Sequence, residues 1–213
     1  FQSMSYTIEV YRGKQKAITH PGYYALYVMF YPQLVAGPIE RPQHLFPQLF
    51  HPKDFSSTNL LSGLRLMAWG FFKKVVVADR LAIYVDGTFN SSDHSGISSL
   101  LAILFFSFQI YADFSGYSDI AIGAAKCMGI NLTLNFNRPY FSKNIGEFWQ
   151  RWHISLSNWF RDYVYIPLGG NKVNKVKWVT NILVTFFLSG FWHGAGWTFI
   201  TWGLLHAVYL IGY

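Results

Sequence analysis

The chain has 213 residues, of which 52% are hydrophobic, 20% aromatic and only 13% charged, and its formal net charge is +7. Soluble domains are typically about 25% charged, so this composition indicates a membrane protein. The lysines and arginines form short clusters between apolar runs, which is typical of membrane-flanking charge and argues against a nucleic-acid-binding protein. The single cysteine, Cys127, excludes an internal disulfide and a cysteine-rich metal site.

The first part of the chain combines an apolar run with a proline-rich segment. Residues 1–4 are typical of the remnant of a cleaved tag, so we exclude them from the fold and expect the native chain to begin upstream. Residues 17–39 carry no Asp, Glu, Lys or Arg and can enter a membrane, with Pro32 kinking or breaking the segment. Residues 37–55 hold four prolines and mixed charge, which predicts a loop or an interfacial segment.

The middle of the chain predicts two long helices. Residues 60–84 form the first, capped by Thr58 or Asn59, and its basic side chains are expected to snorkel toward a membrane surface. Residues 86–96 are then a polar turn. Residues 97–112 are free of charge and long enough to approach a membrane crossing of about twenty residues.

The span continues into a stretch of small residues that lets helices approach closely. These small residues are Ser115, Gly116, Ser118, Ala121, Gly123, Ala124 and Ala125. Asp113 and Asp119 lie in the same stretch, and a carboxylate facing lipid is costly. Both are therefore expected to face protein or water.

The last third predicts an interfacial helix followed by two spans. Residues 131–144 are irregular. The block 145–171 then contains a basic, tryptophan-rich amphipathic helix of the kind found at membrane interfaces, which Pro167 and Gly169-Gly170 end. Residues 178–213 contain no charged residue and have room for two spans, broken near the sequence HGAG, while lysines in 172–177 suggest a cytoplasmic loop. Together these elements predict an all-α, polytopic helical membrane protein with interfacial amphipathic and re-entrant segments.

Three histidines are candidates for chemistry. His193 lies in the apolar run FFLSGFWHGAGW, where it is either a general base or a helix-interface residue hydrogen-bonded to a neighbouring span. His153 lies on the predicted amphipathic helix, as a functional ring or an interfacial aromatic. His206 either orients His193 or caps a helix contact. The chain has no metal-binding histidine spacing and no nucleophile motif, which predicts no metal site and favours direct group transfer.

Several linked segments resemble a known family. They are FYPQLVAGPIERPQHLFPQL, FQIYADFSGYSDIAIGAAKCMGINLTLNFNRPY, EFWQRWHISLSNWFRDYVYIPLGG and FFLSGFWHGAGWTFITWGLLHA. In this order they resemble the membrane-bound O-acyltransferases (MBOATs), in the bacterial branch that contains the alginate O-acetylation membrane protein. The relatives are longer at both ends, so residues 5–213 correspond to the central, incomplete part of one MBOAT membrane domain.

The resemblance implies a central tunnel and O-acyl transfer, most often of acetyl, from a cytoplasmic thioester to the opposite side of the membrane. The donor would be acetyl-CoA or an acylated carrier, with no bound cofactor. The acceptor would be hydroxyls of a cell-surface polysaccharide or a partner protein. The histidine of the FWHG motif, His193, would be essential, and His153 of the FWxRWH motif would be the second active-site residue. The expected substrate-binding residues are Trp149, Arg151, Trp152, Arg161, Trp192 and His206.

The expected location is the cell inner (cytoplasmic) membrane, as a multi-pass protein in contact with the lipid bilayer. His193 would accept the proton of the acceptor hydroxyl. Arg151 and Arg161, together with the lysines of 172–177, can meet the phosphates of a CoA-type donor or simply flank the membrane. A proton or solute transporter that uses His193, His206 and Asp119 as a relay is one alternative. A non-catalytic membrane subunit of a polysaccharide export and modification complex is another.

Overall fold

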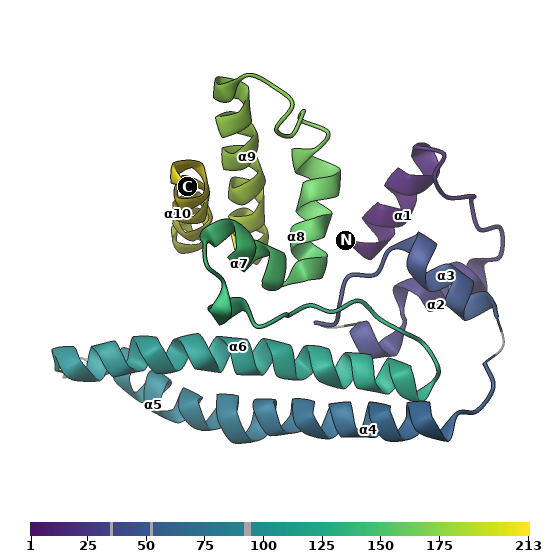
Figure 1. Ribbon diagram of the computed structural model, residues 1–213, viewed down its shortest axis with the longest axis horizontal. Coiled ribbons are helices and arrows are strands. Elements are labelled where there is room, and N and C mark those ends of the chain that lie inside the picture. Colours follow the sequence, from purple (N-terminus) through teal and green to yellow (C-terminus); the bar gives the residue numbers. More distant parts are fainter. Residues whose placement is uncertain (35, 52, 92–94) are drawn as a thin grey trace. The chain divides into compact units, whose positions relative to one another are not determined.

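The computed structural model describes residues 1–34, 36–51, 53–91 and 95–213, and every element within these ranges is helical, as predicted. The chain divides into two compact units, Phe1–Leu134 and Asn135–Tyr213 (Figure 1). The first unit contains α1 (Gln2–Tyr11), α2 (Pro21–Val28), η1 (Tyr31–Gln33), α3 (Pro42–Phe50), α4 (Ser57–Phe71), η2 (Phe72–Ala78), α5 (Asp79–Phe89) and α6 (Gly96–Cys127). The second contains η3 (Pro139–Phe141), α7 (Ile145–Arg151), α8 (Ile154–Phe160), η4 (Arg161–Tyr165), α9 (Lys175–His193) and α10 (Trp197–Gly212).

The predicted membrane span is part of α6, which has 32 residues. At about 1.5 Å per residue such a helix exceeds the roughly 30 Å of a bilayer core. Within the described residues, α6 is the one helix that is long and apolar enough to cross a membrane, and α10 is apolar but shorter. One span is therefore supported, whereas a multi-pass arrangement stays a prediction.

The predicted long helix before α6 is a continuous helical run through α4, η2 and α5, in which η2 is a π-helix. The Ser56 hydroxyl accepts a hydrogen bond from Asn59 N at 3.2 Å and caps the run, so the caps predicted at Thr58 or Asn59 were wrong. The run also extends beyond Tyr84 to Phe89, into the predicted polar turn. Residues 92–94 of that turn lie outside the described residues.

Four glycines let α4 and α6 pack closely, as the stretch of small residues predicts (Figure 1). A Cβ added to Gly63 would lie 2.6 Å from the carbonyl oxygen of Gly123. A Cβ added to Gly70 would lie 2.6 Å from the carbonyl oxygen of Gly116. The glycines are spaced seven residues apart on each helix, so the two contacts repeat along one face.

Ion pairs join the π-helix η2 to α6. Lys73 Nζ lies 2.7 Å from Asp119 Oδ2, and Lys74 Nζ lies 2.7 Å from Asp113 Oδ1. Lys74 also lies 2.8 Å from Asp79. The prediction that both aspartates of α6 face protein or water is confirmed, and two of the lysines expected to snorkel are instead paired with carboxylates.

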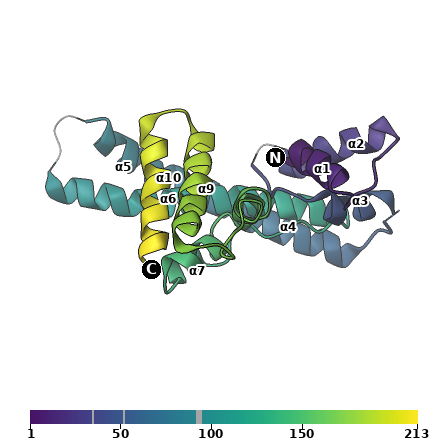
Figure 2. The ribbon, with the colours of Figure 1, turned by 90° about the horizontal axis from the view of Figure 1, so that it is seen from above.

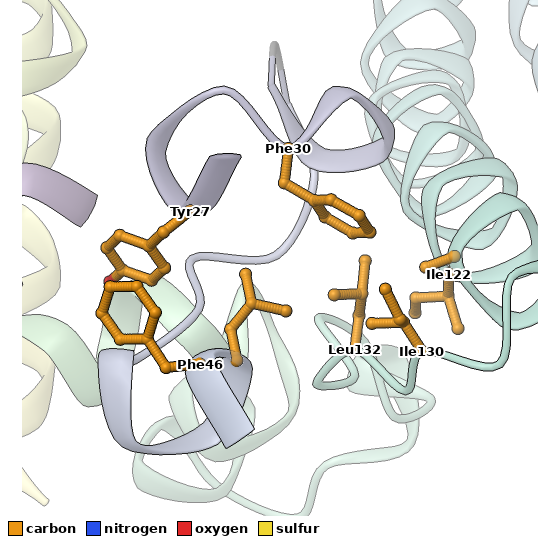
Figure 3. Close-up of a cluster of buried hydrophobic side chains, with 8 residues drawn as sticks. Tyr27, Phe30, Phe46, Ile122, Ile130 and Leu132 are labelled. Carbon is orange, nitrogen blue, oxygen red and sulfur yellow. The ribbon is translucent and has the colours of Figure 1, made fainter. Parts of the chain in front are cut away.

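A hydrophobic core forms where α2 and α3 meet the end of α6 and the segment that follows it. Tyr27 stacks on Phe46 with ring centroids 4.6 Å apart, and Phe30 points toward Ile130 and Leu132 (Figure 3). At eight residues α2 is too short to cross a membrane. It ends at Val28, and Pro32 lies in the short helix η1 that follows, so the segment is broken near Pro32 as predicted.

The proline-rich segment contains a helix, α3, where a loop was one of two predictions. Pro42 occupies the first turn of α3, where the missing N–H costs nothing. Just before it, the buried Glu40 accepts a hydrogen bond from Thr133 N at 2.5 Å and another from the Thr133 hydroxyl, and it lies 2.5 Å from His44 Nδ1. These contacts tie the start of α3 to the segment after α6.

The second unit contains the predicted break at HGAG. α9 ends at His193 and α10 starts at Trp197, and the two helices lie side by side (Figures 1 and 2). A Cβ on Gly190 would lie 2.4 Å from the carbonyl oxygen of Phe199, so the helices approach closely there. The prediction of one uninterrupted amphipathic helix was wrong, because the chain bends between α7 and α8. The helical run does end before Pro167 as predicted, at Tyr165.

Candidate active site

His153 lies at the bend between α7 and α8. Its backbone is left-handed, with φ at 43°, so it cannot continue α7. The residue is only 6% exposed. Its carbonyl accepts a hydrogen bond from Ser157 N at 3.0 Å, which starts α8. The bend thus buries an imidazole that a continuous interfacial helix would have left at its surface.

Burial lowers the pKa of His153 from its usual 6.5 to about 3, and repulsion from a charged His193 acts in the same direction. This second contribution means that the two imidazoles lie within electrostatic range, although they are forty positions apart in the sequence. At neutral pH the ring of His153 is uncharged. It can donate or accept a hydrogen bond but is a weak proton acceptor.

His193 is the last residue of α9, and its ring is surrounded by aromatic side chains. Its centroid lies 4.8 Å from that of Trp192 and 5.1 Å from that of Trp202. The next residue, Gly194, has no room for a side chain, because a Cβ there would lie 2.5 Å from the ring of Phe199. The glycine of the FWHG motif therefore lets the start of α10 pack against the end of α9. His193 itself remains exposed within the described chain.

An aromatic cluster extends from His193 along α10 to α7. Trp202 contacts His206 at 4.8 Å between centroids, and Trp149 contacts Trp202 at 5.9 Å and His206 at 5.0 Å. Trp149 Nε1 and His206 Nδ1 are buried without a hydrogen-bond partner among the described residues. Sequence reasoning missed Trp202, although its position four residues before His206 places both on one face of a helix.

The remaining predicted site residues contact other groups. Trp152 stacks on Phe148 with centroids 5.6 Å apart. Arg151 Nη2 lies 2.5 Å from Glu147 Oε1, and Arg161 Nε lies 2.8 Å from Asp162 Oδ1. The structure therefore brings His153, His193, Trp192, Trp149 and His206 into one neighbourhood of the second unit, whereas both arginines already pair with adjacent carboxylates.

The groups that can take part in a reaction here are the imidazoles of His153 and His193, beside the aromatic side chains of Trp149, Trp192 and Trp202. Among residues 1–34, 36–51, 53–91 and 95–213, no group of three or more His, Cys, Asp or Glu side chains is arranged to hold a metal ion. A neutral imidazole that is reachable from outside can accept a proton from a hydroxyl. A second, buried imidazole can supply a fixed dipole next to it.

Curated proteins with similar sequences are acyl-transfer proteins by name. The chain is 48% identical over 191 residues to the peptidoglycan O-acetyltransferase of Helicobacter pylori, covering 88% of this chain and 36% of that protein. It is 44% identical over 210 residues to the probable alginate O-acetylase AlgI of Azotobacter vinelandii, covering 99% and 42%. It is 34% identical over 198 residues to the teichoic acid D-alanyltransferase of Bacillus subtilis, covering 88% and 50%.

The chain thus spans half or less of the length of these relatives. The family model for the membrane-bound O-acyltransferases matches residues 3–212, nearly the whole chain. The resemblance inferred from the sequence motifs is confirmed, and the chain belongs to the membrane-bound O-acyltransferase family.

Proposed function

We propose that this chain carries the two-histidine centre of an O-acyltransferase that moves an acetyl group from a thioester donor to a hydroxyl acceptor. The observation that carries the proposal is the burial of His153 at the bend between α7 and α8, in the same unit as His193 and within range of that ring's charge. The names of the relatives support acyl transfer. Those at 48% and 44% identity are an O-acetyltransferase and an O-acetylase, which favours acetyl over the D-alanyl group of the relative at 34%.

His193 is the better general base of the two. A thioester is already activated, so the step that needs help is removal of the proton from the attacking hydroxyl oxygen. An effective general base has a pKa near the working pH. The pKa of His153 is about 3, so that ring is poorly suited to the task. The exposed position of His193 allows a hydroxyl to reach its ring.

The reaction then balances as follows. His193 accepts the proton of the acceptor hydroxyl while its oxygen forms a bond to the acyl carbon. The carbon–sulfur bond breaks, the thiolate leaves, and the proton passes from His193 to that sulfur. His153 would donate a hydrogen bond to the carbonyl oxygen as negative charge develops there, which lowers the barrier.

The remaining predicted residues would bind the substrates. Trp149, Trp192 and His206 would form an aromatic wall beside the acyl group. Because Arg151 and Arg161 each have a carboxylate partner, the exposed lysines of segment 172–177 are the better contacts for the phosphates of a CoA-type donor. We propose a multi-pass protein of the cytoplasmic membrane that passes acetyl to a polysaccharide or a partner protein on the opposite side.

The test uses the full-length protein in liposomes with radiolabelled acetyl-CoA. His193→Ala should lower acetyl transfer about 10²- to 10⁴-fold, which is the usual contribution of a general base. His51→Ala, which changes an exposed histidine in the first unit, should match the wild type. If His193→Ala kept a tenth or more of the activity, the general-base role would be wrong. A transporter or scaffold would consume no acetyl-CoA at all.

A further inference from the structure

Residues Asn135–Asn137, at the start of the second unit, form hydrogen bonds with the chain just before and just after the bend at His153. Before the bend, the backbone N–H of Asn137 donates to the carbonyl of Arg151 at 2.9 Å. After the bend, the backbone N–H of Ile154 donates to the carbonyl of Asn135 at 2.9 Å. The Asn135–Asn137 segment therefore fixes the chain immediately before and after His153.

The side chain of Asn135 performs the capping that α8 needs. Asn135 Oδ1 accepts hydrogen bonds from Ser155 N at 3.3 Å and from Ser155 Oγ at 2.6 Å. The first N–H groups of a helix lack partners within the helix, and the residue at the N-cap position usually satisfies one of them with its own side chain. His153 occupies that position in α8 but makes no side-chain capping hydrogen bond. A residue from eighteen positions earlier caps the helix instead.

The left-handed backbone at this bend needs support from the residues around it. His153 and Arg138 are the two non-glycine residues with positive φ in the described chain. A left-handed backbone costs about 1–3 kcal/mol at such a residue and persists only where surrounding contacts impose it. Asn135 is 1% exposed, and His153 and Ser155 are each 6% exposed. Hydrogen bonds buried to this extent are costly to lose.

We infer that Asn135 is a positioning residue for His153. It holds the backbone of Ile154 and Ser155, keeps His153 left-handed, and thereby directs the imidazole toward His193. Asn135 needs no contact with the reacting atoms. The inference rests on the proposed function for its catalytic consequence, but the placement of the ring can be measured without any activity.

The first experiment measures acetyl transfer by the full-length protein in liposomes. Asn135→Leu removes the acceptor at similar size and should lower kcat about 10²-fold with KM within about threefold, because small displacements of catalytic groups have effects of this order. Asn135→Asp keeps an oxygen acceptor, and aspartate is also a good helix cap. Its kcat should be at least tenfold higher than that of Asn135→Leu. Asn137→Ala is the matched control and should keep wild-type activity. Asn137 is exposed, and it donates only its backbone N–H to the carbonyl of Arg151, which alanine retains.

A double-mutant cycle separates positioning from a general structural role. In a His153→Ala background, Asn135→Leu should reduce activity by less than threefold, because the ring that it positions is gone. An equal loss in both backgrounds would overturn the inference, and so would wild-type activity of Asn135→Leu. If His153→Ala and His193→Ala were both fully active, the proposed function would fail instead.

The second experiment does not depend on activity. Diethylpyrocarbonate labelling of the full-length protein, read at His153 by mass spectrometry, should be slow in the wild type because the residue is buried. Labelling should accelerate at least tenfold in Asn135→Leu, and Asn135→Asp should reverse most of this change. Unchanged labelling in Asn135→Leu would show that Asn135 does not hold the ring and would refute the inference.

Discussion

The glycine contacts between α4 and α6 allow a sharp test with a matched control. In Gly70→Ala, the new Cβ would lie 2.6 Å from the carbonyl oxygen of Gly116. In Gly87→Ala, on the same helical run, the new Cβ would meet nothing within 4 Å. Both substitutions gain the same helix propensity of about 1 kcal/mol, so the difference between them reports the helix contact alone.

The expected difference follows from the distances. Ordinary contact begins near 3.4 Å, so the two backbones must separate by 3.4 − 2.6 = 0.8 Å at Gly70. Overpacking of this kind costs about 1–3 kcal/mol. Gly63→Ala adds an equally close contact one heptad away, so in the Gly63→Ala/Gly70→Ala variant the helices cannot relieve one contact by tilting about the other. The double variant should lose at least the sum of the single losses.

Thermal unfolding of the full-length protein in detergent measures these losses. A protein of 150–250 residues loses about 2–4 °C in Tm per kcal/mol, and a protein twice as long loses about half of that, so 1–3 kcal/mol corresponds to roughly 1–6 °C at the length of the relatives. Gly70→Ala should therefore unfold about 1–6 °C below Gly87→Ala, which should equal or exceed the wild type. Equal Tm values for the two single variants would refute the close approach of α4 and α6.

Three further results are expected. The pKa of His153 is about 3 in the folded chain and near 6.5 when unfolded, so between pH 3 and 6.5 the unfolded state binds more protons. The free energy of unfolding should therefore fall by up to about 1.4 kcal/mol per pH unit below pH 6.5. Thermal unfolding from pH 8 to 4.5 should show this slope in the wild type and a smaller slope in His153→Phe. Lys73→Leu leaves Asp119 without its ion pair and should lower the free energy of unfolding by about 3–5 kcal/mol. The double variant Lys73→Leu/Asp119→Leu should recover much of this loss, and equal Tm values for the single and double variants would contradict the pairing. Glu40→Leu removes the buried acceptor of Thr133 and should lower the free energy of unfolding by about 1–3 kcal/mol. It should also speed proteolysis in 131–134, and an unchanged cleavage rate would argue that Glu40 does not hold this segment.

The sequence predicted those parts of the fold that local patterns control. The charge-free run in α6 and the glycine-rich break after His193 were found because length, charge and glycine content are local properties. The bend at His153 was missed because neither proline nor glycine marks it. Asn135 accepts hydrogen bonds from Ile154 and Ser155 just after the bend, and the 3.6-residue pattern of the sequence continues across it.

The candidate site was predicted in part. His193 stood out because an ionisable ring in an apolar run is unusual, but the role of His153 came from the resemblance to a family. The cluster of Trp202, His206 and Trp149 depends on how α7 folds against α10, which local sequence does not encode. The pairing of Arg151 with Glu147 is an i, i+4 contact and could have been anticipated from their spacing.

The π-helix η2 constrains how this chain can change in length. A π-helical segment closes its hydrogen bonds over five residues instead of four and so absorbs an additional residue within a helix. Deleting one residue from 72–78 would remove the residue that the wider turns absorb, so the segment would return to ordinary α-helical bonding and α5 would stay close to its present orientation relative to α4. Lys73 and Lys74 lie within this segment, so the deletion would shift at least one of them away from its aspartate on α6. A deletion in η2 should therefore weaken the ion pairs but keep the helix direction, whereas the same deletion in α4 would rotate everything after it by about 100°.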